Sequence, residues 1–323
     1  MVLKIIATLI PVFGIILLGL AVARRSILPM EAATGLNQFV YWIALPAITF
    51  NILARLNTDG VSGNFLLAVY LALAVNYLLS FVFALWFFRA DKAEAAMLGF
   101  MANFPNGIFM GIPVVSFLLP ADDFAVQIGG LCAFLYAVVM PYTDTVLEML
   151  RHKGESLPKL MLSLGKTMLR NPMIIAGSLG LVCTFSGSRP PEWALNTASM
   201  LGGTAAPCAL FAMGMVMNLQ LAAMGGESFK SFSRQLATHV FKLAVLPCVT
   251  FLLLRLCGVT GTPLGVATLM AAMPTGVVAY VIAQKHHVCV REASMVIVID
   301  TAASVATIPA VIAMLYALNV FSL

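Results

Sequence analysis

Long apolar runs separated by short polar segments recur along the whole chain. A helix of about 20 apolar residues is long enough to cross the hydrocarbon core of a bilayer. Ten runs approach or exceed that length, and we expect each to form one membrane-spanning helix. Their approximate ranges are 5–23, 36–55, 64–88, 95–119, 124–148, 171–187, 193–218, 235–257, 263–284 and 293–319. The pattern therefore predicts an all-α membrane protein whose main partner is the lipid bilayer.

The basic residues fix the expected orientation of these helices. With the N-terminus outside, thirteen of the 18 Lys and Arg residues fall in cytoplasmic segments and four fall outside, while Lys242 lies within a run. Basic residues concentrate on the cytoplasmic side of membrane proteins. We therefore expect a multi-pass protein of the cell inner membrane with both termini extracytoplasmic.

Composition supports the bilayer as the surrounding medium. Charged residues make up 10% of the chain, whereas soluble domains carry about 25%. The net charge of +5 arises largely from short segments between apolar runs, so it indicates topology and we expect no nucleic-acid partner. The six cysteines form no CxxC pair, and the sequence predicts no disulfide framework, no metal site and no cofactor.

The longest polar segment divides the chain into two halves of five predicted helices. We expect a first repeat over 1–150, a cytoplasmic loop over 151–170 and a second repeat over 171–323. Because five is odd, the second half would enter the membrane in the opposite sense. Segments Phe104–Ile108 and Met273–Val277 share the pattern P-x-G in helices four and nine. Interrupted helices in corresponding places of two inverted halves are typical of secondary transporters, although so short a pattern can also arise by chance.

The two prolines predict broken helices. Pro105 has no N–H, and its ring clashes with the carbonyl of Met101, four residues earlier. Pro274 acts in the same way, and Gly107 and Gly276 let the backbone open further. Unsatisfied backbone groups are costly in hydrocarbon, so such breaks are expected only within protein or around a polar cavity. Each break also creates a half-helix N-terminus, which attracts anions.

Polar residues at the breaks are the candidates for ligand contact. The side-chain amide of Asn106 can donate to a carboxylate, and capping of the half-helix is the structural alternative. No catalytic residue is predicted. The expected substrate-binding set is Asn103, Pro105, Asn106, Gly107, Pro274, Thr275, Gly276 and Val277.

Two ionisable residues lie deep within predicted helices. Asp300 and Lys242 are each about two turns from a cytoplasmic end, and ionisable residues inside a membrane are functional candidates. Either Asp300 carries a coupling proton, or it forms a structural pair with Lys242 or another cation. Asp144 lies near a helix end and is expected to be structural, and His286 is expected in a solvated loop.

Segments from both halves resemble the auxin efflux carrier family. Pro105–Pro113 resembles the P-N-T-x-x-M-G-I-P crossover of the plant carriers, and Met273–Val277, followed by Ala283–Lys285, is similar to their second crossover. Arg170–Pro172 and Ala212–Gly214 resemble the sixth and seventh helices of that family. The chain departs from the plant carriers in lacking their long cytoplasmic loop. It resembles the compact bacterial members, which include malate and malonate permeases.

Further departures concern single positions. Gly107 and Thr275 replace a Thr and a common Gln, and Asp300 lies where the plant carriers have no acid. The resemblance implies a scaffold of helices 1, 2, 6 and 7, a moving transport domain of helices 3–5 and 8–10, and elevator-type alternating access. It also implies a homodimer, a small organic anion as substrate and contact between Asn106 and its carboxylate. Substrate identity, direction of transport and coupling to protons, sodium or the membrane potential stay open.

Three other functions remain as alternatives. A sodium symporter of the bile-acid type shares the crossover plan and would need oxygen ligands, of which Asn103, Asn106 and Thr275 supply a few. An intramembrane aspartyl protease would use Asp144 and Asp300. A channel would also place broken helices at the midplane.

Overall fold

The computed structural model describes residues 2–151, 157–222 and 229–321, and these residues are almost entirely helical. The described part of the chain contains no β-strand, only one isolated antiparallel bridge between Pro105 and Thr275. The chain divides into two compact units. Unit 1 comprises Met1–Ser62, Gly107–Phe134 and Asn171–Ala223, and unit 2 comprises Gly63–Asn106, Leu135–Arg170 and Met224–Leu323.

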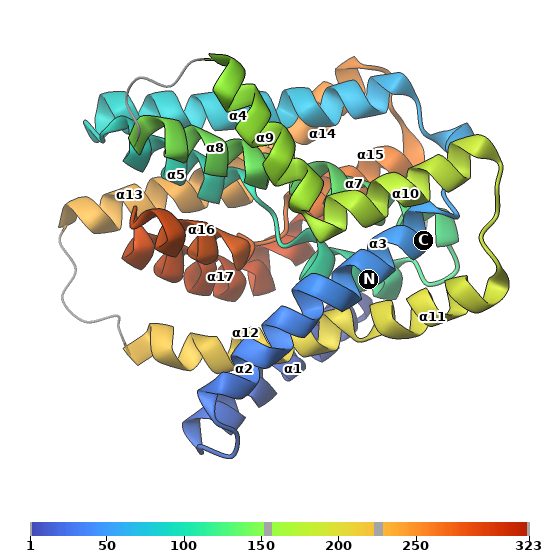
Figure 1. Cartoon of the computed structure of the whole chain (residues 1–323), viewed down its shortest axis with the longest axis horizontal. Coiled ribbons are helices and arrows are strands. Elements are labelled where there is room, and N and C mark those ends of the chain that lie inside the picture. The colour runs from blue at the N-terminus through green and yellow to red at the C-terminus, as the bar shows by residue number, and fades with distance from the viewer. Residues whose placement is uncertain (1, 152–156, 223–228, 322–323) are drawn as a thin grey trace. The chain divides into compact units, whose positions relative to one another are not determined.

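Unit 1 is built around a close pair of helices. Its helices are α1 (Val2–Arg24), α2 (Met30–Phe39), α3 (Leu45–Leu53), α6 (Ile112–Leu118), α10 (Pro172–Ser186), α11 (Glu192–Gly203) and α12 (Ala205–Ala222), and α7 (Asp123–Ala137) begins in it. α12 packs against both α1 and α2 (Figure 1). A Cβ on Gly19 would collide with the carbonyl of Phe211, and one on Gly214 with the carbonyl of Ile16. These glycines therefore allow the α1 and α12 backbones to approach closely, as small residues do between membrane helices.

Unit 2 contains the remaining helices. They are α4 (Gly63–Phe87), α5 (Lys92–Asn103), α8 (Val139–Arg151), α9 (Leu157–Arg170), α13 (Phe229–Val240), α14 (Leu246–Leu256), α15 (Gly261–Ala271), α16 (Val278–His286) and α17 (Val290–Ala317). A π-helical segment, Phe241–Val245, joins α13 to α14. α5 lies beside α4 and α8, and α16 lies beside α17 (Figure 1).

Two short helices form the interior of unit 2. Every residue of α5 from Ala95 to Asn103 is buried, and so is every residue of α15 from Leu264 to Ala271. A helix that is apolar all round is expected in a protein interior. α5 begins with a capping box between Asp91 and Glu94, so its start is fixed by local hydrogen bonds. The first part of each predicted broken helix is therefore a buried α-helix, α5 in one case and α15 in the other.

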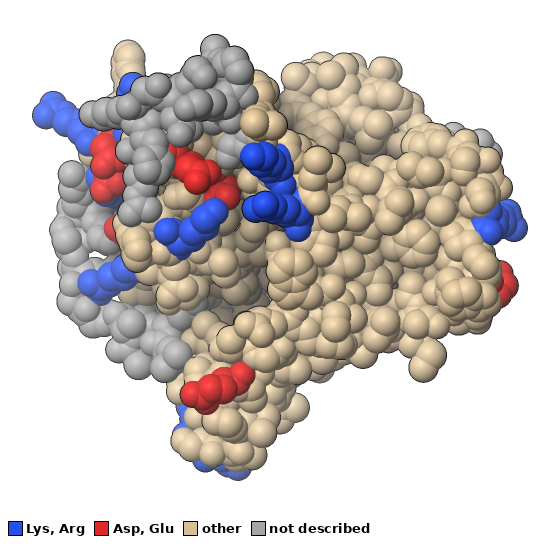
Figure 2. Space-filling view, in the orientation of Figure 1, with Lys and Arg blue, Asp and Glu red and all other residues tan. Residues whose placement is uncertain are grey.

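The helices are those of a multi-pass membrane protein. Among the described residues, six stretches are long and apolar enough to cross a membrane, with a seventh if the helix ending at Arg170 and α10 form one interrupted span. The six are Met30–Leu53, Gly63–Phe87, Asp123–Leu150, Glu192–Asn218, Ser233–Leu256 and Val290–Ala317. The expected spans 95–119 and 263–284 are instead divided into shorter helices at their prolines. Most of the face shown in Figure 2 is uncharged, with Lys, Arg, Asp and Glu at a few places.

The segment 151–170 differs from the expected loop. Residues 152–156 lie outside the described residues, but Leu157–Arg170 form the helix α9. Apolar residues recur there every three or four positions, as in Leu157, Leu160 and Leu164. This period favours an amphipathic helix. Such a helix contains no continuous apolar run, and it was therefore not predicted.

Candidate functional site

The two broken helices of unit 2 meet at their breaks. α5 ends at Asn103, and α15 ends at Ala271 before α16 begins at Val278. Between the helical parts, the Asn106 N–H donates to the Pro274 carbonyl over 2.7 Å, and the Gly276 N–H donates to the Phe104 carbonyl over 2.9 Å. We call this contact between Phe104–Asn106 and Met273–Gly276 the crossing. It is held by the main chain.

The local sequence explains why the segments leave the helical path. Pro105 and Pro274 cannot donate a helical hydrogen bond, and both are buried. A Cβ on Gly276 would lie 2.9 Å from the Phe104 ring. Only glycine at this position therefore permits the observed approach of the two segments without a shift of that ring.

Polar side chains satisfy the carbonyls at the ends of the half-helices. The Thr275 hydroxyl lies 2.9 Å from the Met101 carbonyl, and Asn76 Nδ2 donates to the Ala102 carbonyl over 3.0 Å. At the end of α15, Lys242 Nζ donates to the Ala271 carbonyl over 2.7 Å. The last carbonyls of a helix have no partner within it, so these side chains stabilise the breaks.

Asn106 holds an unused hydrogen-bond donor at the crossing. The residue is 3% exposed, and its Nδ2 is buried with no partner among the described residues. A buried donor without an acceptor costs about 1–3 kcal/mol. A ligand that brings an acceptor to Nδ2 would remove this cost.

Asn103, by contrast, bonds to the protein through both polar groups of its side chain. Its Nδ2 donates to the Leu73 carbonyl over 2.9 Å, and its Oδ1 accepts from Asn76 Nδ2 over 3.1 Å. Both bonds tie the end of α5 to α4. The predicted role of Asn103 in binding therefore competes with a structural one.

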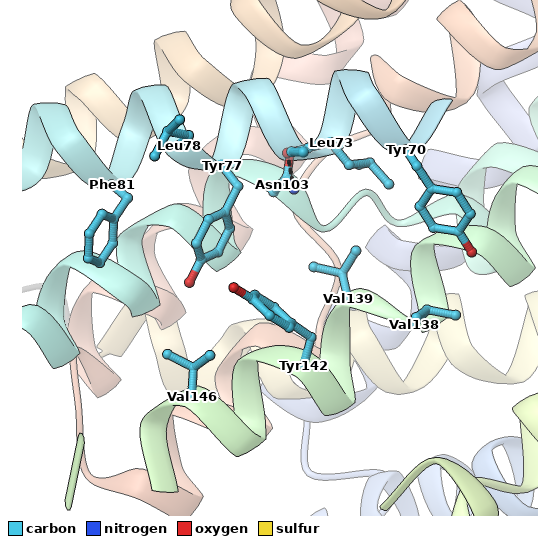
Figure 3. Close-up of a pocket in the computed structure, with 11 residues that line it drawn as sticks. Tyr70, Leu73, Tyr77, Leu78, Phe81, Asn103, Val138, Val139, Tyr142 and Val146 are labelled. Carbon is cyan, nitrogen blue, oxygen red and sulfur yellow. Dashed lines mark hydrogen bonds between the residues drawn. The ribbon is translucent and has the colours of Figure 1, made fainter. Parts of the chain in front are cut away.

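A pocket of about 520 Å³ in unit 2 adjoins Asn103. Tyr70, Tyr77 and Tyr142 line it, and the hydroxyls of Tyr77 and Tyr142 point toward one another across it (Figure 3). Its other walls are Phe81 and aliphatic side chains of α4, α8 and the turn before α8. The pocket thus combines a largely apolar wall with a few hydroxyl groups.

The other predicted positions lie close to the breaks. Gly107 begins a π-helical segment, Gly107–Gly111, that resumes the helix after the first break. Val277 is half-buried and directly precedes α16. Thr275 is fully buried, and its hydroxyl lies between the Met101 carbonyl and, at 2.6 Å, Asp300 Oδ2.

Asp300 has a partner that the sequence interpretation missed. His239 Nδ1 lies 2.7 Å from Asp300 Oδ1. Asp300 and Lys242 are both fully buried, and Asp300 acts electrostatically on Lys242. His239 lies within a predicted membrane helix. The only signal in the sequence was that His239 is a polar residue within an apolar run. Its contact with Asp300 is evident only in the three-dimensional structure.

A second buried carboxylate lies in a separate cluster of unit 2. Asp144 is 5% exposed, accepts from Lys285 Nζ over 2.6 Å and lies 2.7 Å from His286 Nε2. The expectation of a solvated loop was wrong for His286, which is 6% exposed because it packs against Asp144, although His287 is exposed. Asp144 and Asp300 therefore bind different basic groups. Within the residues described, no group of three or more His, Cys, Asp or Glu side chains is placed to hold a metal ion.

A family model described as membrane transport protein matches residues 4–312. The chain belongs to this family, that of the auxin efflux carriers. The match covers both broken helices and nearly the whole chain. The protein is accordingly a membrane transporter rather than an enzyme.

Two of the relatives carry the name of a transporter. The chain is 29% identical to a Rhizobium meliloti protein named "Putative malonate transporter", over 94% of each chain. It is 24% identical to an "Uncharacterized transporter" of Methanothermobacter thermautotrophicus, over 94% of this chain and 95% of the relative. A mouse "Lysosomal cholesterol signaling protein" is 23% identical over 76% of this chain, which spans 29% of that longer protein.

Proposed function

We propose that this transporter is a secondary carrier of small organic anions and that the carboxylate of its substrate binds at the crossing. The observation that carries the proposal is the buried Nδ2 of Asn106, which has no acceptor within the described protein. An ionised carboxylate only accepts hydrogen bonds, so it matches this donor. α16 begins two residues after Gly276, and a helix N-terminus adds a favourable field for an anion.

A pocket lined in part by Asn103, three residues before Asn106 in the chain, favours an organic anion over an inorganic one. The pocket beside Asn103 is lined mainly by aromatic and aliphatic side chains. Such walls suit a carbon skeleton, while a few polar groups orient it. The name of the Rhizobium relative makes malonate the first compound to test.

The proposed architecture is ten spans arranged as two inverted repeats, 1–150 and 171–323. The proposed movement is an elevator, with a scaffold of helices 1, 2, 6 and 7 and a transport domain of helices 3–5 and 8–10. The two compact units support this division, because unit 1 contains α1–α3 and α10–α12 while unit 2 contains α4, α5 and α13–α17. Residues Gly107–Phe134 belong to unit 1, which differs from the implied assignment of helices 4 and 5.

Placement in the membrane and assembly are part of the same proposal. The distribution of Lys and Arg favours the cell inner membrane with both termini outside. Family resemblance is the basis for a homodimer. The accessibility of cysteines introduced at both termini tests the orientation, and cross-linking in native membranes tests the homodimer.

Sodium coupling has less support at this site. A sodium ion needs several oxygen ligands, and both the Asn103 amide and the Thr275 hydroxyl already bind groups of the protein. At the end of α15, where a carbonyl would be available to a cation, the Lys242 ammonium binds instead.

Counterflow in proteoliposomes tests the proposal. The purified protein is reconstituted into liposomes loaded with unlabelled malonate, and uptake of labelled malonate is measured. We expect uptake by the natural protein, a strong reduction in Asn106→Ala, and no change in the matched control Asn64→Ala, whose exposed amide donates to the Cys257 carbonyl.

Two outcomes would contradict the proposal. The carrier function is wrong if neither malonate nor malate nor indole-3-acetate exchanges. The assigned site is wrong if Asn106→Ala exchanges malonate as fast as the natural protein does.

A further inference from the structure

Four polar side chains form a buried group beside the crossing. We call them the charged cluster: His239 of α13, Lys242 of the π-helical segment, Thr275 of the crossing and Asp300 of α17. Lys242, Thr275 and Asp300 are each 0% exposed. Buried charges in a membrane protein are costly and are retained where they pair or act in transport.

The hydrogen bonds define where a proton can bind. An ionised carboxylate only accepts, so in its 2.7 Å contact with Asp300 the His239 Nδ1 carries a hydrogen. In the neutral ring, Nε2 is then an acceptor. Nε2 is buried, and no other described atom bonds to it. The ring as a whole is 12% exposed, so it lies close to the surface of the protein.

The charges of the cluster cancel when Lys242 is protonated, Asp300 is ionised and His239 is neutral. A proton on His239 raises the total to +1, which equals and opposes the charge of one carboxylate.

Other charged groups on the elements packed around the cluster have interactions of their own or are exposed, as Lys92 of α5 is. α15 has none, Glu94 of α5 binds Arg234 of α13, and Lys285 and His286 of α16 bind Asp144. At the start of α17, Glu292 acts on Cys289 together with Glu94, Asp91 and Arg234. Arg291 also has interactions of its own.

Thr275 connects the cluster to the proposed substrate site. Its hydroxyl lies 2.6 Å from Asp300 Oδ2, and its neighbour Pro274 accepts the hydrogen bond of the Asn106 N–H. The contact with Asp300 and the contact with Asn106 are therefore made by adjacent residues, Thr275 and Pro274. A charge added to the cluster acts at short range on an anion bound at the crossing.

We propose that the His239–Asp300 pair is the proton-binding site of this carrier and loads one proton with each carboxylate, so that the transport step moves both. The proton binds at Nε2 of His239 on one side of the membrane and leaves from it on the other. This inference rests on the proposed carrier function, because it assigns the coupling ion to the same site.

Accumulation driven by a pH gradient tests the inference separately from exchange. Proteoliposomes with an alkaline interior are prepared with the membrane potential held at zero by potassium and valinomycin, and labelled malonate is added outside. One pH unit permits about a tenfold accumulation for one proton per anion, since a tenfold ratio corresponds to about 1.4 kcal/mol. Protein-free liposomes provide the correction for passive entry of the acid.

His239→Gln is the decisive variant. Glutamine keeps a donor for Asp300 but does not take up a proton. We expect His239→Gln to retain malonate counterflow and to lose accumulation, while the control His287→Gln, at an exposed position, accumulates malonate like the natural protein. Asp300→Asn is measured in parallel and is expected to show the same uncoupling.

Each contrary result has a defined meaning. Accumulation by both variants at the natural level overturns the inference, and loss of counterflow in both makes the pair structural. Counterflow by the natural protein without accumulation overturns proton coupling but leaves the carrier function intact. Absence of counterflow in the natural protein overturns the carrier function and this inference together.

Discussion

Replacing Asn106 by alanine separates a binding role from a structural one. Asn106 Nδ2 is buried without a partner among the residues described, so its removal breaks no known bond and relieves an unsatisfied donor. We expect the ligand-free melting temperature of Asn106→Ala to equal or exceed that of the natural protein. A hydrogen bond to a charged group contributes about 1.5–3 kcal/mol, so malonate should bind about 10- to 150-fold more weakly.

Asn103→Ala, three residues earlier in the chain, provides the contrasting variant. It removes the bonds of Asn103 to the Leu73 carbonyl and to Asn76. We expect a lower melting temperature because two buried hydrogen bonds between α5 and α4 are lost. Melting curves of both purified variants, recorded with increasing malonate, give stability and affinity in one experiment. A destabilised Asn106→Ala variant with unchanged malonate affinity would refute the reasoning and make Asn106 a structural cap.

Three further predictions concern the crossing and its surroundings. Gly276→Ala should impair counterflow, because its Cβ would lie 2.9 Å from the Phe104 ring and overpacking costs about 1–3 kcal/mol. Adding Phe104→Ala to the same chain should restore counterflow. A fully active Gly276→Ala variant would disprove the steric argument. Lys242→Met should lower the melting temperature, since it removes the donor to the Ala271 carbonyl and the buried cation near Asp300, and adding Asp300→Asn should recover part of the loss. Burial raises the pKa of the Cys289 thiol, and Glu292 is the next cause, so less thiolate is present at pH 8. Maleimide should therefore label Cys289 more slowly in the folded protein than after unfolding in detergent. Equal labelling rates would contradict this prediction.

The helix breaks could be located from the sequence because their causes are local. A proline followed two residues later by a glycine marks each interruption, at Pro105 and at Pro274. Proline alone is not sufficient, since Pro11 and Pro309 lie inside continuous helices. Membrane helices were similarly evident from their long apolar runs. The amphipathic α9 was missed because its apolar residues are spaced rather than continuous.

The polar partners depended on long-range contacts and could not be predicted in this way. Asp300 and His239 are 61 positions apart in the chain, and the sequence analysis named Lys242 or another cation, without identifying His239, as the possible partner of Asp300. His286 follows the same rule: its neighbour His287 is exposed, while His286 packs against Asp144 from another helix. Burial of one of two adjacent identical residues is decided by packing, which local composition does not encode.

The crossing is held together by main-chain bonds, whereas the proposed contact with the substrate is made by the side chain of Asn106. Amide and carbonyl groups join Asn106 to Pro274 and Gly276 to Phe104, and these groups are present whatever side chain position 106 carries. If Asn106 binds the substrate as proposed, a substitution at this position alters which solutes are accepted while the junction stays assembled. Under that proposal, a carrier built in this way acquires new cargo through single amino-acid changes.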